Sequence, residues 1–179
     1  MHSTSPWACR SDERIYEEEL ITTEIETMEE LEERDVSFPP AHTAEHLLNQ
    51  TMIRLFGCER SYNAHVERKK SKMSFRLQQK PTRQQEKAIE ERMNELIASD
   101  LPVTFETVSR YDLPEGVSVE RLPETAGNTV RLVRIGDYDV CPCIGKHVRS
   151  TGQIGRFCLL GTNWDEHEHS FRVRFKIVQ

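Results

Sequence analysis

The chain has 179 residues, of which 36% are hydrophobic and 30% are charged, and its mean hydropathy is −0.65. Such a composition predicts a folded domain with a real core and excludes a membrane-spanning protein, because no apolar run approaches the ~20 residues that cross a bilayer. The net charge of −6 is unevenly distributed: residues 1–38 hold 12 acidic and 3 basic residues, and residues 39–179 hold 18 and 21. We therefore expect an acidic N-terminal arm over 1–38 and a mildly basic domain over 39–179, which permits a nucleic-acid partner.

The N-terminal region and the cysteines bear on the cellular compartment. Residues 1–9 lack the basic segment followed by an apolar segment that marks a secretory signal. Five cysteines, two of them in Cys141-Pro142-Cys143, favour a reduced protein over a disulfide scaffold. We expect a cytoplasmic protein without membrane attachment. Residues 13–34 are rich in Glu and have loosely helical apolar spacing, so a packed helix, a partner-binding arm and a solvating acidic segment all stay open.

The first well-defined helix is predicted over 41–56. Its apolar side chains recur at four-residue steps: Ala44, Leu48, Met52 and Phe56. Pro39-Pro40 suits the entry and Gly57 the C-terminal stop. His42 and His46 lie four residues apart on the first turns, so both imidazoles can face one ion. A helical His pair is more often solvent-facing or partly buried than a metal site, and the pair alone is weak evidence.

Two strands, 61–68 and 73–78, are predicted next, with a basic hairpin tip between them. The tip carries four cations: Arg68, Lys69, Lys70 and Lys72. Such a charge run is usually a solvated turn, and a contact with nucleic-acid phosphates is the alternative.

A second helix is predicted from Thr82, the expected N-cap, to just before Pro102. Strands follow at 103–108 and 129–135, then a loop over 139–147 and a closing hairpin of strands 154–161 and 171–178. The last strand alternates strictly between apolar residues and Arg172, Arg174 and Lys176, which predicts one dry face and one basic face. We predict an α+β fold, a two-layer sandwich of a mainly antiparallel sheet with the helices packed on one side.

Cys143 and His147 repeat the four-residue spacing of the histidine pair about a hundred residues downstream. Thiolate and imidazole together form a zinc ligand set, so we predict one tetrahedral Zn²⁺ site made by His42, His46, Cys143 and His147. A closed site of four protein ligands is usually structural, whereas a catalytic site keeps a position open for water. Asp139 is a candidate acceptor for an imidazole N–H, or simply a loop acid.

His42-Thr-Ala-Glu45-His46 also matches the H-x-x-E-H signature of zinc peptidases, in which Glu45 would be the general base. No other part of the chain resembles those peptidases, and they do not use a Cys-x-x-x-His pair.

A second resemblance covers far more of the chain. His42-Thr-Ala-Glu-His-Leu-Leu48 and Cys143-Ile-Gly-Lys-His-Val-Arg-Ser-Thr-Gly-Gln-Ile-Gly155 resemble the editing domain of alanyl-tRNA synthetase, which recurs in threonyl-tRNA synthetase and in free-standing trans-editing proteins of the small AlaX type. The four predicted ligands fall on the metal positions of that family, and Thr151 begins its Thr-Gly-x-Ile-Gly turn. Ile144 and Lys146 depart from the family's common Cys-Gly-Gly-Thr-His form.

The resemblance implies a zinc-dependent deacylase that hydrolyses mischarged tRNA, Ser- or Gly-tRNA(Ala), in trans. Its partner would be the acceptor end of an aminoacyl-tRNA, held by the basic hairpin tip, and a homo-oligomer stays open. No catalytic residue beyond the metal site is implied, and three residues are candidates: Glu45, Asp139 and Thr151. The alternative from a different class is an inactive, zinc-stabilised module that binds RNA or protein.

Overall fold

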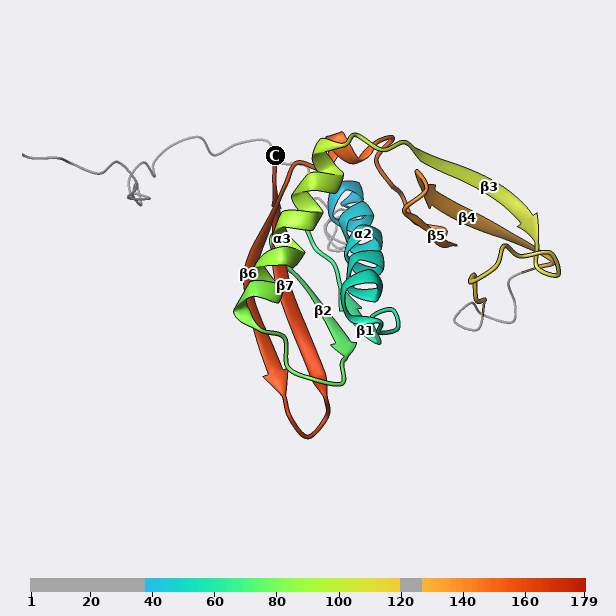
Figure 1. Cartoon of the computed structure of the whole chain (residues 1–179). Coiled ribbons are helices and arrows are strands. Elements are labelled where there is room, and N and C mark those ends of the chain that lie inside the picture. The colour runs from blue at the N-terminus through green and yellow to red at the C-terminus, as the bar shows by residue number, and fades with distance from the viewer. Residues whose placement is uncertain (1–37, 120–126) are drawn as a thin grey trace, which may run out of the picture.

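The computed structural model describes residues 38–119 and 127–179 (Figure 1). The acidic arm predicted over 1–38 therefore lies outside the described residues except for Phe38, and its boundary with the domain stays a prediction. The described elements, in chain order, are α2 (Pro39–Phe56), β1 (Asn63–His65), β2 (Ser71–Arg76), α3 (Arg83–Ala98), β3 (Val103–Ser109), β4 (Thr129–Ile135), β5 (Asp139–Pro142), the 3-10 turn η1 (Thr151–Gln153), β6 (Arg156–Asp165) and β7 (Ser170–Val178).

The main body is a four-stranded antiparallel sheet with the order β1-β2-β7-β6, and α2 and α3 cover one of its faces (Figure 1). The alternation predicted for the last strand is confirmed: Phe171, Val173, Phe175 and Ile177 of β7 are buried, and its three cations are exposed. Aromatic rings fill the layer between sheet and helices: Phe75, Phe157, Phe171 and Phe175 are fully buried. The predicted α+β class, with antiparallel sheet and helices on one side, is confirmed.

The strands do not all join one sheet. β3, β4 and β5 form a separate three-stranded antiparallel sheet, which extends away from the helices (Figure 1). It contributes Val103, Val133 and Ile135 to the common core at the end near the helices. Further out along β3, Phe105 is 47% exposed; the Arg131 guanidinium lies 4.2 Å from its ring centroid, and the His147 ring lies 6.2 Å away.

α3 begins and α2 ends where local sequence rules place those ends. The start of α2 differs from the prediction, because Pro39 and Pro40 form its first turn instead of an entry before residue 41. Thr82 caps α3 in a capping box, because its hydroxyl accepts from the Gln85 N–H and the Gln85 side chain accepts from the Thr82 N–H. Gly57 ends α2 in the left-handed conformation (φ 63°) and its N–H donates to the Ile53 carbonyl. The buried apolar side of α2 packs on the core, and this packing sets the orientation of its first turns.

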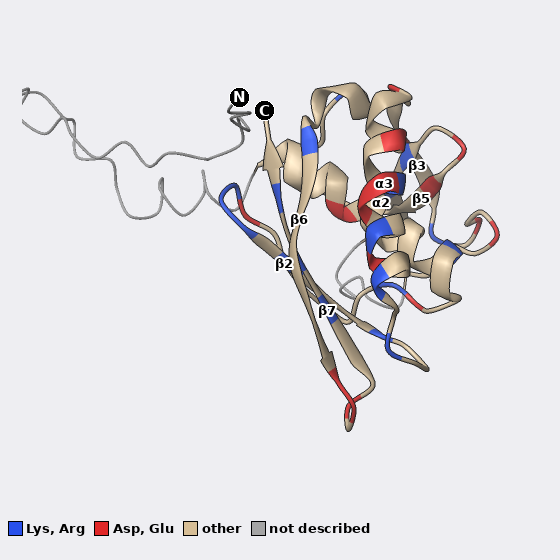
Figure 2. Cartoon of the chain, turned by 60° about the vertical axis from the view of Figure 1, so that its left-hand side comes forward, with Lys and Arg blue, Asp and Glu red and all other residues tan. Residues whose placement is uncertain are grey.

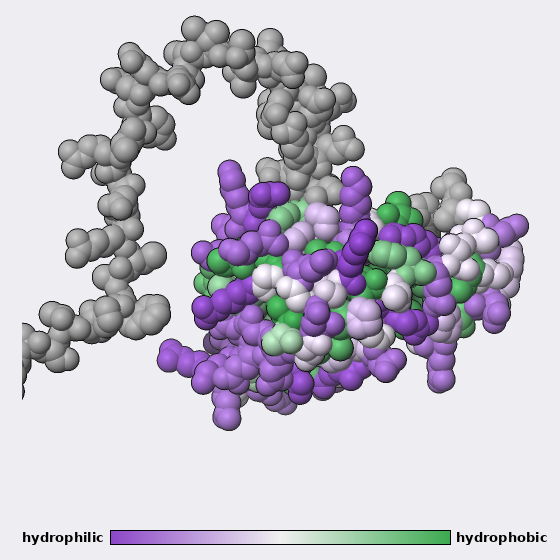
Figure 3. All heavy atoms as spheres, turned by 90° about the horizontal axis from the view of Figure 1, so that it is seen from above, coloured by the Kyte–Doolittle hydropathy of each residue, from purple (hydrophilic) through white to green (hydrophobic). Residues whose placement is uncertain are grey.

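The face of the domain seen in Figure 3 is mostly hydrophilic, with small hydrophobic areas in between. None of the described helices is long and apolar enough to cross a bilayer. The four cysteines of the described ranges, Cys58, Cys141, Cys143 and Cys158, are all free.

Candidate metal centre

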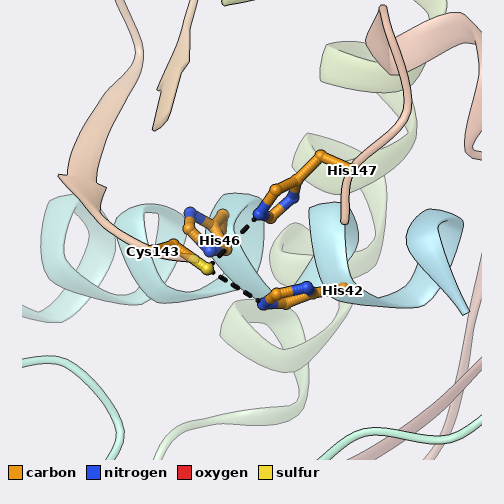
Figure 4. Close-up of side chains that lie close together, drawn as sticks. All are labelled: His42, His46, Cys143 and His147. Atoms are coloured by element: carbon orange, nitrogen blue, oxygen red, sulfur yellow. Dashed lines mark hydrogen bonds between the residues drawn. The ribbon is translucent and has the colours of Figure 1, made fainter. Parts of the chain in front are cut away.

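The structure brings His42, His46, Cys143 and His147 together. The two histidines come from the first turns of α2, and Cys143 and His147 come from the loop that follows β5 (Figure 4). One ligand atom from each residue lies within 4.8 Å of all the others. Nε2 of His42 and Nε2 of His147 are each 3.4 Å from the Cys143 sulfur. Four metal-ligating side chains thus converge on one point.

Neighbouring groups fix the tautomers of two of the imidazoles. Nδ1 of His42 lies 3.1 Å from the Lys146 carbonyl oxygen, which can only accept, so Nδ1 carries the proton. Nδ1 of His147 lies 3.2 Å from Oγ1 of Thr43, which donates its own proton to the Pro39 carbonyl and therefore accepts from the ring. Both Nε2 lone pairs are left free to face the cluster. This is the arrangement in which outer hydrogen bonds orient histidine ligands for a metal.

His46 is oriented by the buried Asp139 and the partly buried Cys141. Its Nδ1 lies 3.1 Å from the Cys141 sulfur and 3.5 Å from Oδ2 of Asp139. The other carboxylate oxygen, Oδ1, accepts from the Arg60 guanidinium. Among the described residues, Oδ2 has no hydrogen-bond partner of good geometry, so the imidazole is its closest polar neighbour. Asp139 therefore lies beside an imidazole N–H, where the sequence analysis expected a candidate acceptor.

The electrostatics of the cluster favour a thiolate ligand. Burial would raise the pKa of the Cys143 thiol, but the imidazoles of His147, His42 and His46 beside the sulfur outweigh burial and lower its pKa to about 3. Cys143 is therefore a thiolate at neutral pH, the form that binds metals. Burial lowers the pKa of His147, which favours its neutral imidazole. The donor set of three imidazoles and one thiolate fits a metal ion.

The loop between Cys143 and His147 is held close against α2. The Arg131 guanidinium donates to the carbonyls of Cys143 at 2.8 Å and Gly145 at 2.9 Å. The Gly145 N–H points at the Cys143 sulfur, 3.4 Å away. A Cβ at position 145 would overlap the His42 ring. Glycine is therefore required here by the close approach of the loop backbone to a metal-ligating imidazole.

A cleft of about 670 Å³ opens beside the cluster. His42, His46 and Cys143 form part of its wall, together with Glu45 from α2 and Ala64 from β1. The Glu45 carboxylate lies 3.8 Å from Nε2 of His42 and is 23% exposed. Burial raises the pKa of Glu45, against the smaller opposing influence of the two helical histidines. A partly desolvated carboxyl group thus faces the cleft next to the metal-ligating atoms.

Two other predicted site elements lie elsewhere. Thr151 is fully buried, and its hydroxyl donates to the Leu96 carbonyl and accepts from the Leu101 N–H, so it ties η1 to the end of α3. None of its bonds within the described ranges reaches the cluster. The basic tip is divided: the Arg68 guanidinium covers the Phe38 ring at 4.6 Å, whereas Lys70 and Lys72 line a separate hollow on the four-stranded sheet.

The sequence analysis missed three residues that support the cluster. Thr43 and Arg131 act through hydrogen bonds to the ligands or their loop, and Cys141 contacts His46. Only Cys141 left a signal, because it is a second potential thiolate ligand two residues before Cys143. The contacts of Thr43 and Arg131 depend on how distant segments pack.

Thr43→Val is expected to weaken metal binding about 10- to 100-fold, because it removes the acceptor that orients His147 while keeping the side-chain shape. Metal affinity measured by competition with a chromophoric chelator would test this. Thr51→Val is the matched control: Thr51 is equally buried on the same helix, but its hydroxyl contacts Met93 and Tyr138 instead. Equal affinities of the two variants would contradict the orienting role of Thr43.

Fold and cluster together define an α+β domain with a Cys/His group that could hold a metal ion. Residues 130–171 match the family described as the second additional domain of threonyl and alanyl tRNA synthetases, and the chain carries a domain of this family. Alanine–tRNA ligase from Treponema pallidum (strain Nichols) is 36% identical over 125 residues, which cover 66% of this chain and 20% of that protein. The enzymes from Treponema denticola and Halorubrum lacusprofundi are 29% and 33% identical over 66% and 68% of the chain. The chain spans only 13 to 20% of the length of these three relatives.

Proposed function

We propose that the chain is a zinc-dependent aminoacyl-tRNA deacylase that hydrolyses mischarged tRNA, Ser- or Gly-tRNA(Ala), in trans. The observation that carries the proposal is a Cys/His cluster that forms part of the wall of an open cleft, with the Glu45 carboxylate beside it. The family match and the similarity to alanine–tRNA ligases support an RNA ester as the substrate class. A site for alanine discriminates poorly against glycine and against serine, so a second, hydrolytic site is needed to remove the errors.

Zinc is the metal that the donor set favours, since it accepts both thiolate and imidazole and prefers four ligands. When bound, zinc can polarise an ester carbonyl or lower the pKa of a water molecule towards ~7. The chain itself supplies imidazole nitrogens, the Cys143 thiolate, and a cleft that shields the ester. Glu45 is the candidate to accept a proton from the attacking water, because its carboxylate lines the cleft next to His42.

The test is release of serine, glycine and alanine from charged tRNA(Ala), with zinc content determined on the same sample. We expect serine or glycine to be released quickly and alanine to be spared. Glu45→Gln should slow hydrolysis by about 100-fold or more without changing the zinc content. Glu59→Gln, an exposed carboxylate on the wall of the same cleft, is the control and should behave as wild type. No release from fully zinc-loaded protein would contradict the proposal.

A second function is favoured by one observation: three imidazoles and a thiolate are all the ligands that a closed, structural zinc site needs. In that case the chain would be a zinc-stabilised module that binds RNA or protein without catalysis. Zinc-loaded protein that binds tRNA(Ala) but releases no amino acid would establish it. Cleavage of peptides, abolished by Glu45→Gln with metal retained, would instead support the H-x-x-E-H peptidase.

A further inference from the structure

A basic hollow of about 480 Å³ lies on the outer face of the four-stranded sheet, opposite the helices. Its cations are Lys70 and Lys72 from the β1–β2 hairpin and Arg172 and Arg174 from β7, and His65 and Asn163 complete the wall with Glu67. Figure 2 shows basic residues both on β7 and at the end of the hairpin. Two segments about a hundred residues apart in sequence thus form one positively charged surface.

The charge of this hollow is not neutralised by the described parts of the chain. No ion pair joins Lys70, Lys72, Arg172 or Arg174 to a described carboxylate, and the one acidic residue of the hollow, Glu67, is engaged by His65. Some exposed cations elsewhere on the domain have acidic partners: Arg76 pairs with Glu168, Lys87 with Glu91, Arg92 with Glu95 and Arg134 with Glu106. Unpaired cations gathered in a concave surface attract a polyanion.

The strand register places two of these cations side by side, which destabilises the sheet when no anion is bound. Lys72 and Arg174 are direct cross-strand partners on β2 and β7, and like charges in such positions destabilise a sheet. The neighbouring strand makes room for the guanidinium: a Cβ at Gly161 would come within 3.0 Å of Nη2 of Arg174. Nε of Arg172 donates to the Ser74 hydroxyl at 3.4 Å, which orients the second guanidinium. A bound anion would remove the repulsion between the two cations.

The hollow and the metal-centre cleft lie on opposite sides of one edge strand. Within β1, Ala64 lines the cleft, whereas the next residue, His65, lines the hollow. Since β1 is the outermost strand of the sheet, nothing else of the sheet separates the two sites. An RNA strand that passes over this edge can therefore have phosphates in the hollow and its 3′ end in the cleft.

We propose that this hollow binds the phosphodiester backbone of the RNA substrate and guides its 3′ end across β1 to the metal centre. The identity of the RNA rests on the proposed function. This surface differs from the hairpin tip predicted from the sequence. The Arg68 guanidinium packs on the Phe38 ring instead of lining the hollow, and Arg172 and Arg174 of β7 line it.

The test compares tRNA(Ala) binding by the wild-type chain and an Arg172→Gln/Arg174→Gln double variant over a range of salt concentrations. We expect roughly tenfold weaker binding at low salt and a slope of log K against log salt that is smaller by about 1 per cation removed. Lys87→Gln/Arg92→Gln removes two exposed cations from α3 and should leave both quantities unchanged. The melting temperature of Arg174→Gln should not fall, because the substitution relieves repulsion with Lys72.

Hydrolysis of seryl-adenosine, an ester without phosphates, separates this inference from the proposed function. The double variant should hydrolyse it as fast as wild type while losing activity on Ser-tRNA(Ala). If neither protein hydrolyses any ester but tRNA binding still depends on the two arginines, the deacylase proposal fails and the hollow stands. Unchanged tRNA affinity and salt slope in the double variant overturn the inference, including the case in which inorganic phosphate alone binds there.

Discussion

Replacing His46 by alanine is expected to abolish metal binding and, with it, any metal-dependent hydrolysis. His46 is the most buried of the four ligands, at 4% exposed, and the only one in contact with Asp139 and Cys141. A three-ligand remnant cannot hold the metal in the same way, and we expect activity to fall by more than about 100-fold. The metal content per chain, measured by atomic spectroscopy together with deacylation, checks both effects.

The same substitution should also destabilise the fold. It leaves the buried Asp139 carboxylate facing a void, with Arg60 as its remaining cationic partner. Breaking a buried polar pair costs on the order of 3 kcal/mol, which denaturant unfolding would detect. A misfolded variant would lose its metal whether or not His46 is a ligand. Removing the metal from wild-type protein with a chelator therefore provides a second measurement of the metal dependence of hydrolysis. His167→Ala, an exposed histidine on the turn between β6 and β7, is the control, and a His46→Ala protein that keeps one metal per chain would refute the ligand assignment.

Gly145→Ala is expected to disrupt the metal centre although position 145 donates no ligand atom. The added methyl group would overlap the His42 imidazole, and the loop cannot retreat freely because Arg131 holds the carbonyls of Cys143 and Gly145. His42 must therefore rotate away from the cluster or the loop must break these bonds. We expect metal affinity to fall by about 10- to 100-fold or more, as for the loss of other interactions that orient a ligand.

Metal titration of the Gly145→Ala protein would measure this loss directly. The matched control is Gly127→Ala, because a Cβ at Gly127 has no atom within 4 Å and its backbone is not left-handed. The control should bind metal as wild type does. Wild-type affinity in Gly145→Ala would mean that the loop is not held against His42.

Parts of the fold with strong local signals were predictable from sequence. Thr82 and Gln85 define the start of α3 by bonds within one turn, and the alternation along β7 reports directly which face is buried. The division of the strands into two sheets was not predictable, because it depends on which strands pair across long separations. The exposed Phe105 on β3 shows the consequence, since a strand pattern alone does not reveal that a sheet extends beyond the core.

For the site, the two four-residue spacings were enough to bring the four metal-ligating residues into one hypothesis. The residues around them were harder to foresee. Thr43 meets His147 across a sequence separation of 104 residues, and a threonine in a helix has no pattern that predicts such a contact. Arg68 was grouped with its lysine neighbours by charge, whereas the structure uses it to cover the ring of Phe38.

The position of the four ligands along the chain has a consequence for how the domain unfolds. His42 and Cys143 are 101 residues apart, one on the central helix and the other in the loop that leaves the small sheet. A metal ion that joins them closes a long loop, and cross-links of that length restrict the unfolded chain by on the order of 4–5 kcal/mol when covalent. Apart from Val130 and Leu132, the buried apolar residues in the sheet of β3, β4 and β5 belong to the common core at its inner end. Bound metal would therefore make the small sheet unfold cooperatively with the helices. Without the metal, the small sheet would unfold before the rest of the domain.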